Sequence, residues 1–115
     1  MERDELAYLR HVLDAIRRIQ EYVDGVDEQA FCNRSLIQDG VIRQLEIIGE
    51  AVKQLPDAFR ERHPAIPWQD IAGTRDMLIH HYFGVNLGEV WMMVQRDIPV
   101  LKAEVAKIIQ DMTSA

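Results

Sequence analysis

Apolar residues recur every three or four positions along most of this 115-residue sequence. That spacing puts them on one face of an α-helix, and no segment shows the strict alternation that is typical of a half-buried strand. The longest apolar stripes lie in residues 4–23, 33–55 and 87–112. Each stripe can be buried only against another helix, so we predict an all-α fold, an antiparallel bundle of four to five helices. A chain of this length suits a single domain over residues 1–115.

Turn and capping residues indicate where the first helices end. Gly25 is expected to end the first helix, and Asp27 can cap a short helix over residues 28–32. The second long helix is expected to begin near Asn33 or Ser35. Pro56 is expected to stop it, because a proline disfavours helical geometry in the residue before it.

Prolines also organise the second half of the chain. A short helix is expected over residues 57–62, and Pro67 suits the first turn of a further helix that ends near Gly84. Pro99 lies inside the last predicted helix, where its ring would clash with the carbonyl group of Gln95. We therefore expect a kink in that helix.

Charge and cysteine content narrow the class of protein. The net charge of −6 argues against a protein held on nucleic acid by bulk charge, although a nuclease needs only a local positive site. No apolar run approaches the roughly 20 residues of a membrane span, and the charged N-terminus has no signal-peptide core, so we expect a cytoplasmic protein. Cys32 is the single cysteine, which excludes an intramolecular disulfide and a Cys-based zinc site. We expect Cys32 to be a buried apolar residue.

Five polar residues gather in one otherwise apolar segment: Arg75, Asp76, His80, His81 and Tyr82. On a regular helix, Arg75 and Tyr82 lie within about 20° of each other, whereas His80 lies about 140° from Arg75. Arg75 and His80 could converge in three ways: the helix loosens beyond His80, the Arg75 side chain reaches around, or two copies of the helix meet in a dimer. His81 is expected to point away from His80.

These residue types suit metal-independent RNA cleavage. A neutral imidazole can take the proton of a ribose 2′-hydroxyl group, and a guanidinium can hold the phosphate and stabilise its developing charge. Tyr82 could position the phosphate or stack on a base. No Asp, Glu and His cluster with metal-ligand spacing accompanies them, so we expect no metal and no other cofactor.

The same segment resembles the R-x4-H-x-Y signature of the HEPN superfamily, specifically that of the HepT toxins. Arg75, His80 and Tyr82 occupy the three signature positions. Asp76 stands where the family often has Asn, and its carboxylate could orient Arg75 or partly neutralise it. The similarity continues through LEIIGEAVKQLP and PWQDIAGTRDMLIHHYFGVNLGEVW and covers nearly the whole chain.

The resemblance implies a HEPN-like bundle that forms a homodimer, with two motifs facing one cleft. It implies an endoribonuclease, the toxin of a type VII-like toxin–antitoxin system, in which Arg75 and His80 are the catalytic pair. Its cognate antitoxin would be a minimal nucleotidyltransferase that AMPylates Tyr82. The added bulk and charge would keep RNA out of the cleft. Asp76 and His81 would support the motif or contact RNA.

Two other functions stay open. The chain could be a non-catalytic nucleotide- or substrate-binding partner of a nucleotidyltransferase, in which Arg75 holds a phosphate without RNA cleavage. It could also be a structural dimerisation bundle with a vestigial motif.

The surroundings of the motif also allow more than one interpretation. Glu46 and Glu50 form either a solvated face with an ion pair to Arg43 or a polar patch that orients Arg75. The large apolar residues outside the stripes are interpreted as core or dimer interface; they are Trp68, Trp91, Met92 and Met93.

Overall fold

The computed structural model describes the backbone of residues 2–80 and 86–114, and the side chains of residues 4–74 and 86–114. All regular structure in these ranges is helical, which confirms the predicted all-α class. In chain order the elements are α1 (Glu2–Tyr22), α2 (Glu28–Asn33), α3 (Ser35–Gln54), α4 (Asp57–Glu61), α5 (Trp68–His80), α6 (Leu87–Met92), a π-helical segment (Met93–Asp97) and α7 (Ile98–Thr113). The predicted end of the motif helix at Gly84 lies outside the described residues.

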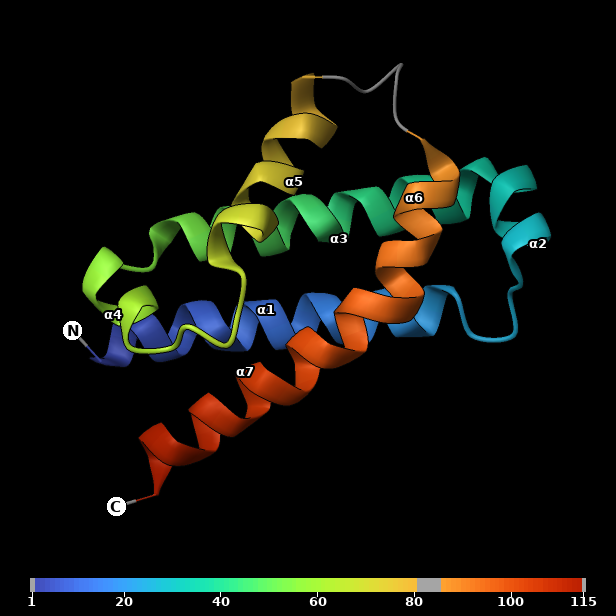
Figure 1. Ribbon diagram of the computed structural model, residues 1–115. Coiled ribbons are helices and arrows are strands. Elements are labelled where there is room, and N and C mark those ends of the chain that lie inside the picture. The colour runs from blue at the N-terminus through green and yellow to red at the C-terminus, as the bar shows by residue number, and fades with distance from the viewer. Residues whose placement is uncertain (1, 81–85, 115) are drawn as a thin grey trace.

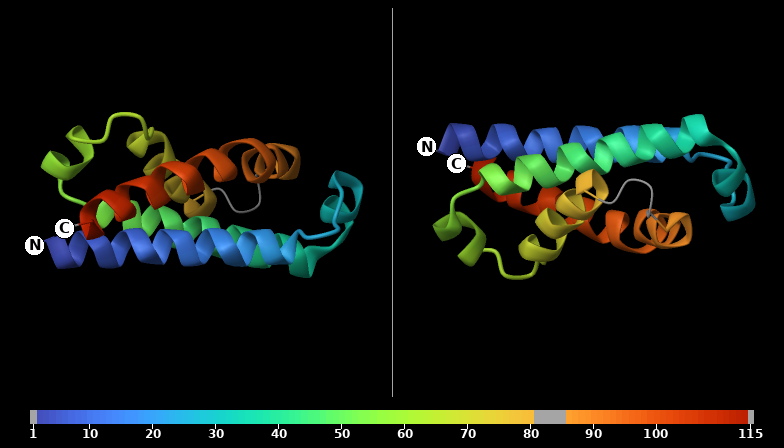
Figure 2. Two further views of the ribbon diagram at one scale, coloured as in Figure 1. Left: turned by 90° about the horizontal axis from the view of Figure 1, so that it is seen from below. Right: turned by 90° about the horizontal axis from the view of Figure 1, so that it is seen from above.

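The helices form two layers. The long helices α1 and α3 run antiparallel, side by side, and make up one layer (Figure 1). Helices α5, α6 and α7 make up the second layer, on one side of that pair (Figure 2). Helix α5 packs on α3, and α7 packs on α1. The motif helix and the C-terminal helix therefore share one layer, and each has a face turned away from the α1–α3 pair.

The core between the layers consists of the apolar stripes. Almost completely buried residues come from α1, α3 and the α6–α7 region: Leu9, Val12, Ile16, Ile19, Val41, Leu45, Ile48, Val52, Val90, Val94 and Val105. Each aliphatic side chain buried in this way contributes roughly 1.5–3 kcal/mol. The periodicity of the sequence thus predicts which face of each long helix is buried.

The corner between α1 and α3 follows the predicted capping. Gly25 has a φ angle of +72°, the left-handed conformation that ends helices. The Asp27 carboxylate accepts a hydrogen bond from the backbone N–H of Ala30 at 2.8 Å and so caps α2. Phe31 of α2 is fully buried, and its ring centroid lies 5.3 Å from that of Trp91. This aromatic contact attaches the corner to α6. Cys32 is exposed, so the prediction of a buried cysteine is wrong.

A π-helical segment accommodates Pro99, which gives the predicted kink a specific form. The backbone N–H of Ile98 bonds to the carbonyl oxygen of Met93, five residues back. This wider turn relieves the clash that the Pro99 ring would cause in a regular α-helix. It also accommodates the absence of a backbone N–H donor at Pro99. The predicted single helix over residues 87–112 is therefore divided into α6, the π-helical segment and α7, and the chain changes direction there (Figure 1).

Gly40 shows why α3 tolerates a glycine in its interior. A Cβ atom at this position would lie 3.2 Å from two ring carbons of Tyr22. Glycine therefore lets the Tyr22 ring lie directly against the backbone of α3. Gly49 is buried in the same helix.

Candidate functional site

Three of the motif residues lie on α5. Arg75, Asp76 and His80 belong to this helix, which is continuous from Trp68 to His80. Their side chains are not among those described, and His81 and Tyr82 lie outside the described residues. His80 lies five positions after Arg75 on a regular helix, so their backbone positions differ by about 140° and about 7.5 Å along the axis. The described part of the helix gives no loosening that would bring them together.

The N-terminal end of α5 is held firmly by the corner that precedes it. Trp68 is buried, and its indole N–H donates to the carbonyl oxygens of Arg60 at 3.1 Å and His63 at 2.9 Å. The Phe59 ring lies against both Trp68 and His63. These contacts fix where α5 starts, and they confirm the interpretation of Trp68 as a core residue. Trp91 is also buried.

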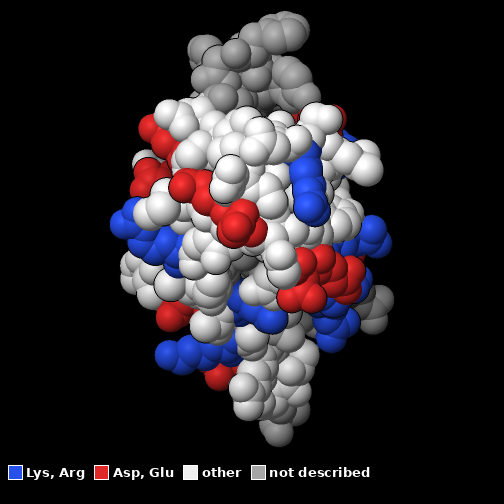
Figure 3. Space-filling model, turned by 90° about the vertical axis from the view of Figure 1, so that its right-hand side faces the viewer, with Lys and Arg blue, Asp and Glu red and all other residues white. Residues whose placement is uncertain are grey.

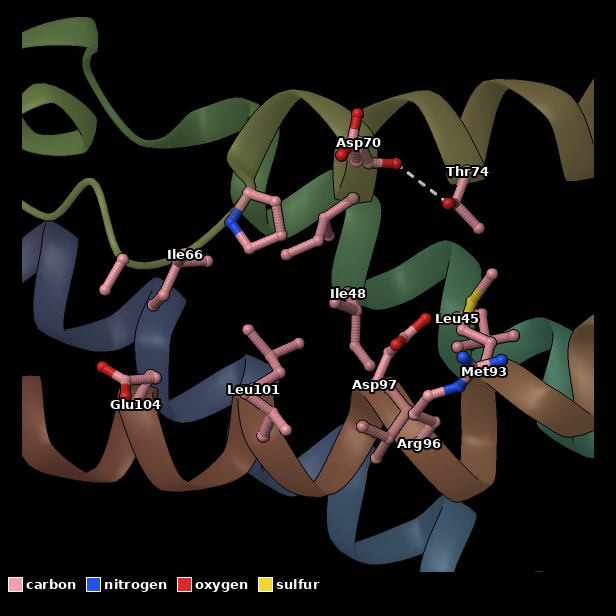
Figure 4. A pocket seen from close by; sticks show the side chains of 15 residues that line it. Leu45, Ile48, Ile66, Asp70, Thr74, Met93, Arg96, Asp97, Leu101 and Glu104 are labelled. Atoms are coloured by element: carbon pink, nitrogen blue, oxygen red, sulfur yellow. Dashed lines mark hydrogen bonds between the residues drawn. The ribbon is translucent and has the colours of Figure 1, made fainter.

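An apolar groove lies between α5 and α7, directly before the motif. Its volume is about 350 Å³, and Thr74, the residue that precedes Arg75, is among the residues that line it. Ile48, Ile66 and Leu101 contribute apolar side chains to its wall (Figure 4). The Thr74 hydroxyl donates to the backbone carbonyl of Asp70 at 2.9 Å.

Four charged side chains line this groove. Asp70, Arg96, Asp97 and Glu104 line it, and the Asp97 carboxylate points toward the space between α5 and α7 (Figure 4). No ion pair joins any of the four to another residue that the structure describes. Sequence reasoning missed this groove. The available signal was a second stripe in the last helix, Arg96, Val100 and Glu104, at fourfold spacing and off the core face.

Charges elsewhere are paired or mixed. On α1, Arg17 lies 2.6 Å from both Asp14 and Glu21, and hydrogen bonds from Arg17 and Arg18 lower the pKa of Asp14. The face shown in Figure 3 carries interspersed positive and negative side chains, with no continuous basic surface. Bulk charge therefore gives that face no general affinity for nucleic acid.

The acidic residues of α3 make local contacts. Glu46 lies 3.8 Å from Arg43, and the amide of Gln54 donates to Glu50 at 3.2 Å. This supports the interpretation of a local ion pair. An effect of Glu46 or Glu50 on Arg75 stays a prediction, because the Arg75 side chain is not described.

No group of three or more His, Cys, Asp or Glu side chains among the described residues could hold a metal ion. None of the helices, over the residues that the structure describes, is long and apolar enough to cross a membrane.

Comparisons with known proteins bear on the whole chain. A family model described as "Ribonuclease HepT-like" matches residues 12–108. A Methanocaldococcus jannaschii protein named "Gamma-glutamylcyclotransferase and putative RNase" is 47% identical over 97% of this chain, which spans only 50% of that protein. A "Putative RNase" of Caldanaerobacter subterraneus is 45% identical over 90% of this chain and 92% of its own. The "Probable ribonuclease HepT" of Thermococcus cleftensis is 43% identical over 94% and 98%, respectively. No solved structure gave a significant match.

Proposed function

Because the chain belongs to the ribonuclease HepT-like family, we propose that it is an endoribonuclease with Arg75 and His80 as its catalytic pair. The observation that carries the proposal is the family match over residues 12–108, which contains the complete R-x4-H-x-Y pattern. Relatives that are more than 40% identical over nearly the whole chain bear names of ribonucleases.

The proposed reaction needs no metal. The imidazole of His80 takes the proton of a ribose 2′-hydroxyl group, and the 2′-oxygen attacks the adjacent phosphorus. The guanidinium of Arg75 holds the phosphate oxygens while negative charge develops on them. The 5′-oxygen of the next nucleotide leaves with a proton from an imidazolium, and the products are a 2′,3′-cyclic phosphate and a 5′-hydroxyl end. Asp76 and His81 support these groups or contact the RNA.

A homodimer completes this site. The described part of α5 is regular, and its geometry separates Arg75 from His80 by about 140° on one helix. Two motif helices that face each other would place Arg75 of one protomer and the histidine of the other at one phosphate. The second histidine would also provide the acid that protonates the leaving oxygen.

The biological role follows as a second part of the proposal. The enzyme acts as the toxin of a type VII-like toxin–antitoxin system in the cytoplasm, where RNA and ATP are present. A cognate minimal nucleotidyltransferase acts as antitoxin by transferring AMP to Tyr82. The new phosphate would repel RNA from the motif, and the adenosine would block it sterically.

Cleavage by the purified protein tests the catalytic pair. We expect RNA cleavage in the presence of EDTA, and Arg75→Ala or His80→Ala should reduce its rate by roughly a hundredfold or more. Arg10→Ala and His11→Ala are matched controls, since both residues are exposed on α1. Expression of the wild-type chain alone should stop growth, and either motif variant should restore it.

Two outcomes would contradict this assignment. The first is wild-type protein that leaves RNA intact, and the second is a pair of motif variants as active as the wild type. Tight binding of AMP in calorimetry, together with intact RNA, would instead support the non-catalytic nucleotide-binding function.

A further inference from the structure

The groove between α5 and α7 has one end next to the motif. Thr74 lines the groove, and Arg75 follows Thr74 at the next position of α5. Arg96 lies toward the Thr74 end of the groove, whereas Glu104 lies toward the Ile66 end (Figure 4). Because consecutive Cα atoms are only about 3.8 Å apart, a strand held at Arg75 has this end of the groove within reach.

The walls of the groove suit a flat, largely apolar group. Its volume of about 350 Å³ lies in the range of small-ligand pockets. Ile48, Ile66 and Leu101 line it, and Val100, which is 61% exposed, adds apolar surface that is in contact with water. A nucleobase between these side chains would remove that surface from water. Packing between apolar side chains is a common way of holding a base outside its stack.

The π-helical segment supplies two charged groups to the groove. Arg96 and Asp97 are consecutive residues of this segment, and both line the groove. The Asp97 carboxylate points toward the space between α5 and α7 (Figure 4). Neither residue forms an ion pair with another residue that the structure describes. One guanidinium and one carboxylate are thus available to a ligand, and π-helical turns frequently occur at functional sites.

The hydrogen-bonding capacity of Asp97 selects among ligands. An ionised carboxylate can only accept hydrogen bonds, and it does so through two oxygens. Guanine is the RNA base whose Watson–Crick edge presents two adjacent donors, the N1–H and the exocyclic amino group. On that edge adenine, cytosine and uracil place an acceptor beside each donor. A carboxylate in an apolar groove therefore favours guanine over the other three bases.

From this arrangement we infer that the groove is a guanine-binding subsite for the RNA nucleotide next to the cleaved bond. Asp97 is its specificity-determining residue and accepts from the two donors of the base. Arg96 holds a phosphate of the same strand. The subsite rests on the proposed function, which makes RNA the substrate. Each protomer has such a groove beside its own α5, so the subsite is compatible with two motif helices that share one cleft.

An organic cation is the competing occupant. Asp70, Asp97 and Glu104 line the groove with three carboxylates, against the single guanidinium of Arg96. Glu104 lies toward the other end of the groove, however, and Arg96 is the residue next to Asp97 in the chain. A cation bound at Asp97 would be repelled by Arg96, whereas an uncharged base is not repelled and its phosphate is attracted. These charges favour a nucleotide at the motif end.

Binding of mononucleotides tests the subsite without cleavage. Calorimetry on the full wild-type chain would compare 5′-GMP, 5′-IMP and 5′-AMP. We expect GMP to bind roughly tenfold or more tightly than AMP, with IMP between them, because IMP keeps the N1–H but lacks the exocyclic amino group. Asp97→Asn should remove this preference, since an amide offers one acceptor in place of two. Asp111→Asn, at an exposed aspartate of α7, is the matched control and should keep it.

Cleavage of short strands tests Asp97 in the proposed reaction. Each strand would be DNA with a single ribonucleotide, so that one bond can be cleaved, and the bases on both sides of that bond would be varied. We expect kcat/KM to be roughly tenfold higher with guanine at one of these two positions. Asp97→Asn should lower it there through a higher KM, because Asp97 contacts the base and not the reacting atoms.

Substitution of Arg96 separates phosphate binding from base recognition. Arg96→Gln should weaken binding and cleavage of all these strands by a similar factor, since a phosphate contact carries no information about the base. The guanine preference should remain. Arg10→Gln, at an exposed arginine of α1, is the control and should have no effect. Circular dichroism would check that each variant keeps its helical content.

The outcomes separate this subsite from the proposed function. A guanine preference that Asp97→Asn abolishes would support the subsite, even if no RNA is cleaved. Equal binding of GMP and AMP, no binding at about 5 mM nucleotide, or a preference that survives Asp97→Asn would overturn it, even if RNA is cleaved as proposed. Binding of spermidine that depends on Asp97, without binding of any mononucleotide, would identify an organic cation as the occupant and would also overturn it.

Discussion

At the scale of single residues, the informative charges are those without a partner. Asp14, Arg17 and Glu21 satisfy one another on the exposed side of α1, and pairs of this kind add little stability in water. Because the pKa of Asp14 is lowered, its favourable contribution is present at neutral pH and is lost as the pH falls through the lowered value. Arg96 and Glu104 form no ion pair with any other residue that the structure describes.

Tyr82 is the residue at which the proposed regulation can be tested. Co-expression with a nucleotidyltransferase encoded beside it should add the mass of an adenylyl group to the intact chain, and peptide mapping should locate the group on Tyr82. This modification would place a phosphate at the motif and so inhibit RNA binding there. Tyr82→Phe should prevent the modification, while Tyr8→Phe, a half-buried tyrosine of α1, should leave it unchanged. An unmodified Tyr82 beside an active transferase would count against this regulation.

Only the chemistry of the candidate site could be predicted at this scale. The residue types of Arg75, His80 and Tyr82, and their spacing, indicate phosphate binding and proton transfer. Their spacing on a helix also shows that Arg75 and His80 diverge. Which groups of another helix or protomer complete the site depends on long-range packing, and the periodicity of a single helix contains no information about that.

At the scale of elements, the start of α5 is set by a tryptophan and two carbonyl groups. The Trp68 indole bridges the carbonyl oxygens of Arg60 and His63 and thereby fastens the motif helix to the preceding corner. In the sequence, Pro67 is a helix-start signal, and Trp68 was interpreted as core or dimer interface. The hydrogen bonds that orient the helix involve backbone groups, which the sequence does not single out.

Removal of the indole N–H tests that anchor. Trp68→Phe keeps an aromatic ring in the core but removes the donor to both carbonyls, so we expect a loss of about 1–2 kcal/mol in the free energy of unfolding. Urea denaturation followed by circular dichroism would measure it. Gln69→Ala, at the exposed neighbouring position, is the control. A Trp68→Phe variant as stable as the wild type would show that the anchor is energetically unimportant.

At the scale of the whole molecule, one aromatic contact holds the corner around α2 to the second layer. The Phe31 ring is completely buried and packs against Trp91. This contact attaches α2, which lies between α1 and α3 in the chain, to α6. The α6 helix in turn precedes the π-helical segment and α7. Packing at Phe31 therefore supports the position of α7.

Truncation of Phe31 should affect the entire fold. Phe31→Ala should lower the free energy of unfolding by roughly 3–5 kcal/mol, because it removes a large buried ring and leaves a cavity. Since a domain of this size has roughly 5–15 kcal/mol in total, the unfolding midpoint in urea should fall markedly. Leu36→Ala, at an exposed leucine, should shift the midpoint little. A small loss at Phe31 would mean that the corner is loosely attached.

The sequence by itself determined the all-α class, the buried face of each long helix and most helix ends, because periodicity, caps and prolines act over a few residues. Asp27 caps α2 and Pro56 follows α3 as their chemistry requires. Only the tertiary structure decided that Cys32 is exposed and that a π-helical segment accommodates Pro99. It also decided that an apolar groove lies between α5 and α7, beside the motif helix. Those features depend on which helix faces pair across the two layers, and residues far apart in the chain settle that pairing together.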